Sequence, residues 1–205
     1  MVYCPFVKPQ PDVQAGVLEL FRSTGAYLAG HFRLTSGLHS PEYLQCARVL
    51  QHPRHAEELG RKLAERLLEL AGPERVDVVA SPAIGGLIIG HEVARALGAR
   101  FIFAERDGGK MTLRRGFEVA HGENAVVVED VVTTGGSTRE VVDCLREHGA
   151  RGLAAGSIID RSGGAADVGV PRAALETMQV VSYPPESCPL CAQGIPVVKP
   201  GSRPT

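Results

Sequence analysis

The chain has 205 residues, of which 44% are hydrophobic and 22% are charged, and its formal net charge at pH 7 is -1. This length suits one domain with a substantial core. The near-neutral charge argues against a nucleic-acid binder held by overall charge. The start lacks the layout of a signal peptide, and the longest apolar region, VDVVASPAIGGLIIG, is too short and too rich in Gly, Pro and Asp to span a bilayer. We therefore expect a cytoplasmic protein with neither a nucleic-acid partner nor a membrane segment.

The first third of the chain predicts two helices with short strands between them. Apolar residues recur near helical spacing over about 12–29, and residues 31–50 read as two short strands around a Ser-Gly turn. Residues 52–72 form an amphipathic pattern that ends at a Gly-Pro pair, which predicts a helix. His52 and His55 begin this helix, and we expect both to lie at its exposed end.

From residue 76 onward strands alternate with helices. We predict strands at 76–81, 99–105, 124–130 and 152–161, and helices at 85–98 and 137–149. This alternation predicts right-handed βαβ units and a parallel sheet. A charged loop is expected from Arg106 to Gly116, and the tail after Tyr183 is expected to be irregular and to cover the rest of the molecule.

The stretch VVVEDVVTTGGST, residues 126–138, joins a buried strand to two acids and a loop of small residues. In a parallel sheet the strand would deliver Glu129 and Asp130 to the carboxyl edge, where ligands bind. The loop that follows offers backbone N–H groups and hydroxyls at a helix start, which suits a phosphate. Carboxylates accept hydrogen bonds from sugar hydroxyls, so the stretch predicts a ribose 5-phosphate site. Its residues are Glu129, Asp130, Val131, Val132, Thr133, Thr134, Gly135, Gly136 and Ser137.

This ordered pattern resembles the phosphoribosyl pyrophosphate signature of the type I phosphoribosyltransferases. A buried strand followed by a capped helix would explain the valines and Ser137, but it leaves the two acids unexplained. The resemblance implies an α/β fold with a central, mainly parallel sheet flanked by helices. It also implies one domain over residues 1–205, with a core at about 54–182 and a small hood from about 12–50 and 183–205.

Three further stretches resemble orotate phosphoribosyltransferases. They are FRLTSGLHSPEYLQ (32–45), which would lie over the base, FAERDGGKMTLRRGF (103–117), which would be a mobile loop, and SIIDRSGG (157–164). The resemblance implies transfer of phosphoribose from phosphoribosyl pyrophosphate to orotate in pyrimidine biosynthesis. The alternatives are a purine phosphoribosyltransferase and a non-catalytic, nucleotide-sensing RNA-binding regulator of the same fold.

Arg161 ends a predicted strand at the same sheet edge as Asp130, and the resemblance implies that it binds the orotate carboxylate. A guanidinium can grip a carboxylate with two parallel hydrogen bonds. The alternative is a surface ion pair with Asp160 or Asp167. Thr133 is expected to reach the base as well.

The loop at 105–116 is implied to close over the neighbouring subunit's site, and therefore to require a homodimer. Lys110 and Arg106 are the candidate catalytic contacts to the leaving pyrophosphate, while Arg114 and Arg115 could hinge or brace the loop. The alternative is an ordinary solvated connector. Mg²⁺ is the implied cofactor, and we expect it to be held mainly by substrate and water rather than by protein ligands.

The pyrophosphate loop of the family matches SPAIGGLIIG, and its candidate residues are Ala83, Ile84, Gly85 and Gly86. A plain strand-to-helix turn is compatible with the same residues. Better-known relatives carry lysines where this chain has Gly85 and Thr35, and a loop histidine that KMTLRR lacks. The basic residues are therefore rearranged, and Lys110, Arg114 and Arg115 are the candidates to take over from the missing cations.

The pair Cys188 and Cys191, in CPLC, is half of a zinc signature. Cys4 or a partner chain could supply the missing ligands, and the alternative is a tight turn with two free thiols. His39 lies in the base-covering segment and is a candidate substrate contact. No function is expected for the remaining histidines His31, His91, His121 and His148.

Overall fold

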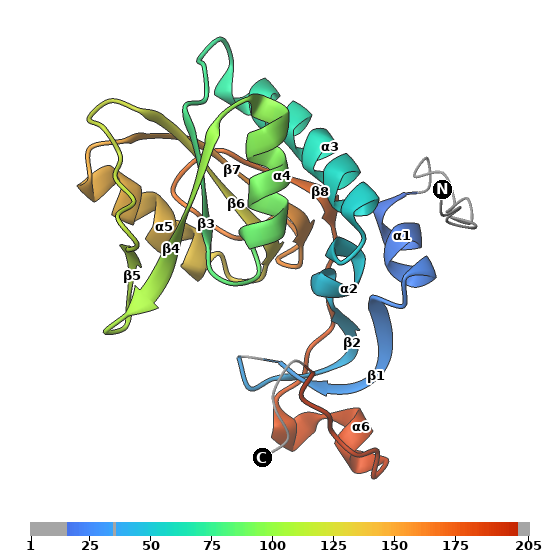
Figure 1. Ribbon diagram of the computed structural model, residues 1–205. Helices are drawn as coiled ribbons and strands as arrows, with labels where there is room; N and C mark the ends of the chain where they lie inside the picture. The colour runs from blue at the N-terminus through green and yellow to red at the C-terminus, as the bar shows by residue number, and fades with distance from the viewer. Residues whose placement is uncertain (1–15, 35, 201–205) are drawn as a thin grey trace, which may run out of the picture.

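The computed structural model describes residues 16–34 and 36–200, and its centre is a six-stranded sheet (Figure 1). The strand order is β5-β4-β3-β6-β7-β8. The strands are β3 (Val78–Pro82), β4 (Arg100–Asp107), β5 (Lys110–Leu113), β6 (Asn124–Val132), β7 (Arg151–Asp160) and β8 (Arg172–Thr177). All pairs are parallel except β4 with β5, so the predicted, mainly parallel sheet is confirmed.

Helices cover both faces of the sheet. Helices α3 (Pro53–Ala71) and α4 (Leu87–Leu97) pack on one face and α5 (Gly136–Glu147) on the other (Figure 1). Because neighbouring strand residues point to opposite faces, Val79 and Val126 enter the core under α3 and α4, while Val78 and Val127 enter the core under α5. Both cores form from nearly continuous valine runs, as expected for strands buried on two sides.

A smaller layer projects from one end of the sheet (Figure 1). It contains α1 (Val17–Ser23), β1 (Tyr27–Arg33), β2 (His39–Leu44) and α2 (Cys46–Leu50) from the first part of the chain. The C-terminal tail adds η1 (Pro185–Ser187) and α6 (Pro189–Ala192). We call the antiparallel β1–β2 hairpin together with residues 183–200 the hood.

The tail is attached to the hairpin by backbone hydrogen bonds. The His39 N–H donates to the Tyr183 oxygen at 2.8 Å, and the Tyr183 N–H returns the bond at 2.8 Å. The Arg33 N–H donates to the Val198 oxygen, also at 2.8 Å. The tail therefore contacts both hairpin strands. Among the described residues, no helix has the length and apolarity needed to cross a membrane.

Several predicted boundaries were wrong. The helix expected at 12–29 ends at Ser23, because Gly25 turns the chain with φ +64° and a strand begins at Tyr27. Residues 12–15 of that prediction lie outside the described part of the chain. The loop expected from Arg106 to Gly116 is largely an antiparallel hairpin, with Gly108 and Gly109 at its turn.

Three further features differ from the expectations. β8 was not predicted, and the tail is partly helical rather than wholly irregular. His55 is buried, with 4% of its surface exposed, because it faces inward from the first turn of α3. The expected exposed position was therefore wrong for His55.

Candidate active site

Glu129 and Asp130 lie near the carboxyl end of β6, at the edge where β3 and β7 also end. Glu129 is buried, and this burial, with the charge of Asp130 adding to it, raises the pKa of Glu129 well above its ordinary range. The Asp130 N–H donates to Glu129 Oε1 at 3.3 Å, and the Val131 N–H donates to Asp130 Oδ1 at 2.8 Å. Among the described residues, no lysine or arginine forms an ion pair with either carboxylate. The two acids are thus placed to receive hydroxyl donors or a cation.

The loop after β6 forms a pocket of about 60 Å³, well above the roughly 10–15 Å³ that one water needs. Its lining residues are Glu129, Val131, Val132, Thr133, Thr134, Gly135, Gly136, Ser137 and Thr138. Eight of the nine predicted phosphoribose residues therefore line one pocket. Asp130 does not line it, and its carboxylate lies against Gly85 in the loop between β3 and α4.

Gly135 shapes the phosphate pocket. Its φ of +82° is one that other residues rarely adopt, and a Cβ there would lie 2.9 Å from Val168 Cγ1. The turn lets α5 begin at Gly136 without a side-chain cap, so backbone N–H groups of the first helical turn remain available. Together with the helix dipole, these donors make the pocket suitable for an anion.

The predicted pyrophosphate loop packs against the acids. It joins β3 to α4, and the Ala83 N–H donates to the Ala104 oxygen at 2.8 Å. A Cβ on Gly85 would lie 2.6 Å from Asp130 Oδ1, and a Cβ on Gly86 would lie 2.8 Å from the Val128 oxygen. Any residue larger than glycine at 85 therefore needs the Asp130 carboxylate to occupy a different position. A lysine at 85, as in better-known relatives, would force Asp130 to move.

Arg161 follows β7, and its N–H donates to the Val132 oxygen at 2.8 Å, which fixes it beside the phosphate loop. Its guanidinium is half-buried, and Nε has no hydrogen-bond partner among the described residues. Burial lowers the pKa of Arg161, while Tyr43 and Glu42 on β2 act in the opposite direction. The guanidinium therefore faces the hairpin strand rather than open solvent.

The alternative ion pairs of Arg161 do not form. Asp160 is 1% exposed and pairs with Arg172 at 2.6 Å. Asp167 pairs with Arg139 at 2.8 Å. Because other arginines pair with both carboxylates, Arg161 is a half-buried cation that remains available to an anionic ligand.

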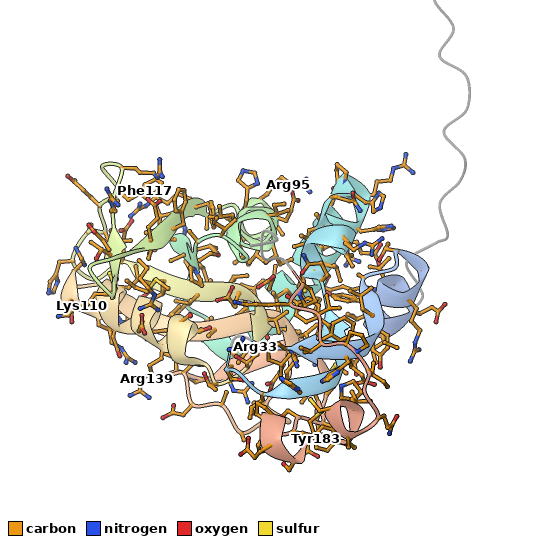
Figure 2. All side chains as sticks on the ribbon, turned by 90° about the horizontal axis from the view of Figure 1, so that it is seen from below. Arg33, Arg95, Lys110, Phe117, Arg139 and Tyr183 are labelled. Carbon is orange, nitrogen blue, oxygen red and sulfur yellow. The ribbon has the colours of Figure 1, made fainter. Side chains whose placement is uncertain are left out.

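The β4–β5 hairpin carries the predicted catalytic cations, and they differ in their contacts. Lys110 is exposed, and its side chain makes no hydrogen bond or ion pair with a described residue. Arg106 instead donates to the Gly109 oxygen at 2.5 Å and pairs with Glu140 of α5 at 2.6 Å. In Figure 2, Lys110 projects at the margin of the molecule, apart from the labelled hood residues Arg33 and Tyr183. Among the described residues, the Lys110 side chain forms no hydrogen bond or ion pair with Glu129, Asp130 or Arg161.

The stem of the hairpin is braced by an exposed ion pair. Arg115 donates two hydrogen bonds to Glu105, each 2.8 Å long, and its guanidinium lies over the Phe103 ring. The hydrogen bonds from Arg115 lower the pKa of Glu105. Arg115 is therefore a bracing residue, one of the two roles considered for it, and Lys110 is the unengaged cation nearer the tip.

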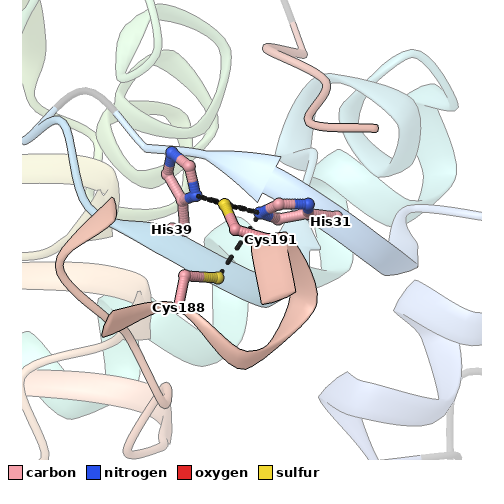
Figure 3. A group of neighbouring side chains, drawn as sticks. All are labelled: His31, His39, Cys188 and Cys191. Atoms are coloured by element: carbon pink, nitrogen blue, oxygen red, sulfur yellow. Dashed lines mark hydrogen bonds between the residues drawn. The ribbon is translucent and has the colours of Figure 1, made fainter. Parts of the chain in front are cut away.

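Two features of the site were missed in the sequence. Tyr43 lies in the segment that is expected to cover the base, and it faces Arg161, but no motif in the sequence distinguishes it. His31 and His39 converge with Cys188 and Cys191 on the hood (Figure 3). His39, a candidate substrate contact, is buried in this group instead, and its partner His31 had been given no function.

Comparison with known proteins identifies the family. Residues 46–171 match the family model described as the phosphoribosyl transferase domain. The orotate phosphoribosyltransferase of Pelotomaculum thermopropionicum is 58% identical over 187 residues, which cover 91% of this chain and 96% of that protein. That of Heliobacterium modesticaldum is 55% identical over 190 residues, covering 93% and 98%.

Solved structures agree with this assignment. The crystal structure of orotate phosphoribosyltransferase from Aeropyrum pernix superposes with a TM-score of 0.65 at 27% identity, and covers 78% of this chain and 93% of that chain. An adenine phosphoribosyltransferase from Saccharomyces cerevisiae, 16% identical with a TM-score of 0.60 and covering 77% and 99%, shares the fold alone. The chain belongs to the orotate phosphoribosyltransferases, within the phosphoribosyl transferase domain family.

Proposed function

We propose that this chain transfers the phosphoribosyl group of 5-phospho-α-D-ribose 1-diphosphate to orotate, giving orotidine 5′-phosphate and diphosphate in pyrimidine biosynthesis. The observation that carries the proposal is the position of Arg161. Its guanidinium is half-buried and is not paired with an acid. Its backbone N–H donates a hydrogen bond to the Val132 oxygen, next to the phosphate loop. Orotate is a planar base with a carboxylate, and this arrangement offers that carboxylate a two-pronged partner beside the ribose.

The phosphoribose would lie along the loop after β6. The N–H groups at the start of α5 would bind the 5-phosphate, with hydroxyls from Thr133, Thr134 and Ser137 adding donors. Glu129 and Asp130 would accept hydrogen bonds from the 2- and 3-hydroxyls. As pyrophosphate leaves, the ribose carbon becomes cationic, and the two carboxylates stabilise that charge at short range.

The residues at this edge fit Mg²⁺. This ion takes one or two carboxylates together with phosphate oxygens and keeps several waters, so a cage made only of protein ligands is not needed. Glu129 and Asp130 are carboxylates without a cationic partner among the described residues. When bound, Mg²⁺ neutralises charge on the pyrophosphate.

Arg161 would orient the base so that a ring nitrogen points at the ribose carbon. The half-buried Tyr43 borders the same guanidinium, so the base would be placed between the hairpin strand β2 and the edge of the sheet. If orotate binds as its anion, the ring nitrogen attacks without a dedicated base. Exclusion of water by the hairpin strand would favour transfer to orotate over hydrolysis.

The leaving pyrophosphate would be bound by backbone N–H groups of residues 83–86 and by a lysine. Lys110 is an exposed cation of the β4–β5 hairpin, and its side chain forms no hydrogen bond or ion pair with a described residue of its own chain. We propose that it serves the neighbouring site of a homodimer. A closed, dry site would make its charge effective.

An absorbance assay of orotate consumption with phosphoribosyl pyrophosphate and Mg²⁺ tests the reaction, with adenine and hypoxanthine run alongside. Turnover of orotate alone is the expected result. Turnover of a purine would leave the phosphoribose site in place and refute the role of Arg161. Phosphoribosyl pyrophosphate binding without any turnover would favour the nucleotide-sensing regulator.

Mixing two inactive variants tests the contribution of Lys110 to the neighbouring site. Lys110→Ala and Arg161→Met are co-refolded, so that heterodimers form with one defect in each chain. If Lys110 acts across the dimer, one site of each heterodimer is intact, and statistical mixing restores about a quarter of wild-type activity. If Lys110 acts within its own chain, no site is intact and activity stays at the level of the single variants.

A further inference from the structure

We propose that His31, His39, Cys188 and Cys191 form a structural zinc site that fixes the C-terminal tail to the β1–β2 hairpin. Each residue offers one ligand atom, and the four atoms all lie within 4.8 Å of one another (Figure 3). Two imidazole nitrogens and two sulfurs are a ligand set found in structural zinc sites. The site is separate from the carboxyl edge of the sheet and is not needed to explain phosphoribosyl transfer.

The distances between ligand atoms match tetrahedral coordination. With Zn–N of about 2.0–2.1 Å and Zn–S of about 2.3 Å, neighbouring ligand atoms in a regular tetrahedron lie about 3.3 Å apart for two nitrogens and about 3.6 Å apart for nitrogen and sulfur. His31 Nε2 lies 2.9 Å from His39 Nδ1 and 3.5 Å from Cys188 Sγ. Cys191 Sγ lies 3.7 Å from His31 Nε2 and 3.2 Å from His39 Nδ1. Four of the six pairs therefore have spacings close to those around one ion.

The hydrogen bonding of His31 suits a metal ligand. Its Nδ1 lies 2.7 Å from the Ile195 carbonyl oxygen, which can only accept, so Nδ1 carries the proton. Nε2 is then left with a lone pair directed at the other three atoms. A backbone carbonyl that fixes the tautomer in this way is the usual outer partner of a zinc-bound histidine.

Burial also favours a metal over an ordinary polar contact. His31, His39 and Cys188 are 3%, 6% and 3% exposed, so their ligand atoms are removed from water and need partners within the protein. Within residues 184–200, all of them described, Cys188 alone is buried. The tail therefore has almost no apolar core of its own, and exposes Val197 and Val198 at 46% and 54%. A segment of this kind commonly depends on a metal or a disulfide for its order.

The arrangement favours a structural role. All four positions of a tetrahedral ion would be filled by protein, which leaves none for a substrate. The site joins β1 and β2 to the ends of α6, since Cys188 precedes that helix and Cys191 lies within it. A disulfide between the two cysteines would tie neither of them to the hairpin and would leave the convergence of both histidines unexplained.

Metal analysis of the full-length protein, purified without chelator, tests the proposal. We expect about one zinc ion per chain, and a decrease of at least about tenfold in Cys188→Ser and Cys191→Ser. Cys144→Ser is the matched control, since Cys144 is also a buried free cysteine with a histidine nearby, His148, but with no further ligand. The control is expected to keep its zinc.

A second measurement does not depend on the folding of variants. Wild-type protein stripped of metal and loaded with Co²⁺ should show the intense visible bands of tetrahedral cobalt with thiolate ligands. The proposal is overturned if the wild type binds neither Zn²⁺ nor Co²⁺ above the level of Cys188→Ser. It is also overturned if the protein, isolated without reductant and still active, contains a Cys188–Cys191 disulfide by mass spectrometry.

Discussion

Replacement of Arg161 by Met should strongly reduce activity without destabilising the fold. Arg161 Nε is buried without a partner, and burial lowers the pKa of the guanidinium, so the folded protein without ligand gains little from this cation. A buried unsatisfied donor costs about 1 kcal/mol or more. Met has similar length and no donor, so the free energy of unfolding should rise by about 1 kcal/mol, or Tm by about 2–4 °C for a chain of this size.

The cost to catalysis should be much larger. Loss of one partner of a desolvated charge pair costs about 2–5 kcal/mol, and the half-buried position of Arg161 places its loss near 3 kcal/mol. This corresponds to about a 150-fold decrease in kcat/KM for orotate. The dissociation constant of phosphoribosyl pyrophosphate should change little, because the phosphate loop is intact.

Arg172→Met is the matched control with the opposite outcome. Arg172 pairs at 2.6 Å with Asp160, which is 1% exposed, so its removal leaves a buried carboxylate without its cation. We expect the unfolding free energy to fall by about 3 kcal/mol. Thermal denaturation and steady-state kinetics of both variants provide the comparison. An Arg161→Met protein that loses stability but keeps kcat/KM for orotate would refute the assignment of Arg161 to the substrate.

Substitutions of Gly85 and Glu129 test the rest of the edge. Gly85→Ala should lower kcat/KM for phosphoribosyl pyrophosphate by about tenfold or more, because the added Cβ would lie 2.6 Å from Asp130 Oδ1. Gly16→Ala is the control, since no atom lies within 4 Å of its added Cβ, and it should match wild type in the same assay. Equal activity of the two alanine variants would show that Asp130 can move freely. Burial raises the pKa of Glu129, so its protonated form stabilises the ligand-free fold fully below about pH 4.3, and this contribution is lost as pH rises through the raised pKa. Glu129→Gln should therefore have a higher Tm than wild type at pH 8 and an equal one near pH 4. The hydrogen bond from Arg100 lowers the pKa of Glu123. Glu123→Gln should therefore have a lower Tm than wild type at pH 8, and this difference should disappear as pH falls through the lowered pKa. The same pH trend of Tm in both variants would contradict the reasoning.

The sheet was predictable because its strands are buried on both faces. Runs such as AVVVED have no competing helical period, and each is followed by a helix of the length that a parallel connection requires. β8 was not predicted because its sequence, RAALET, has as much helical as strand character, and only its pairing with β7 makes it a strand. The end of the first helix was wrong for a similar reason, since the pairing of Tyr27 with Leu44 prevails over a weak local helical pattern.

The phosphoribose site could be read from the sequence because its residues are contiguous and their order carries the chemistry. The surroundings of Arg161 depend on contacts between distant segments, such as Tyr43 with Arg161, and no local spacing encodes them. The histidine and cysteine group is the extreme case. Its two halves were visible separately, but CPLC suggested only half of a site, and the two histidines that converge with it lie on β1 and β2. Cys4, the other candidate ligand, lies outside the described residues.

The distance along the chain between His31 and Cys188, 157 residues, has a consequence for how the protein is made. At a synthesis rate of about 5–20 residues per second, the tail leaves the ribosome about 8–30 s after the hairpin that it must cover. The sheet and its helices can fold in that interval, because every strand of the sheet precedes residue 178. The hood is therefore the last part of each nascent molecule to be completed, and chains interrupted before Cys188 would contain a folded phosphoribose site beneath an unfinished hood.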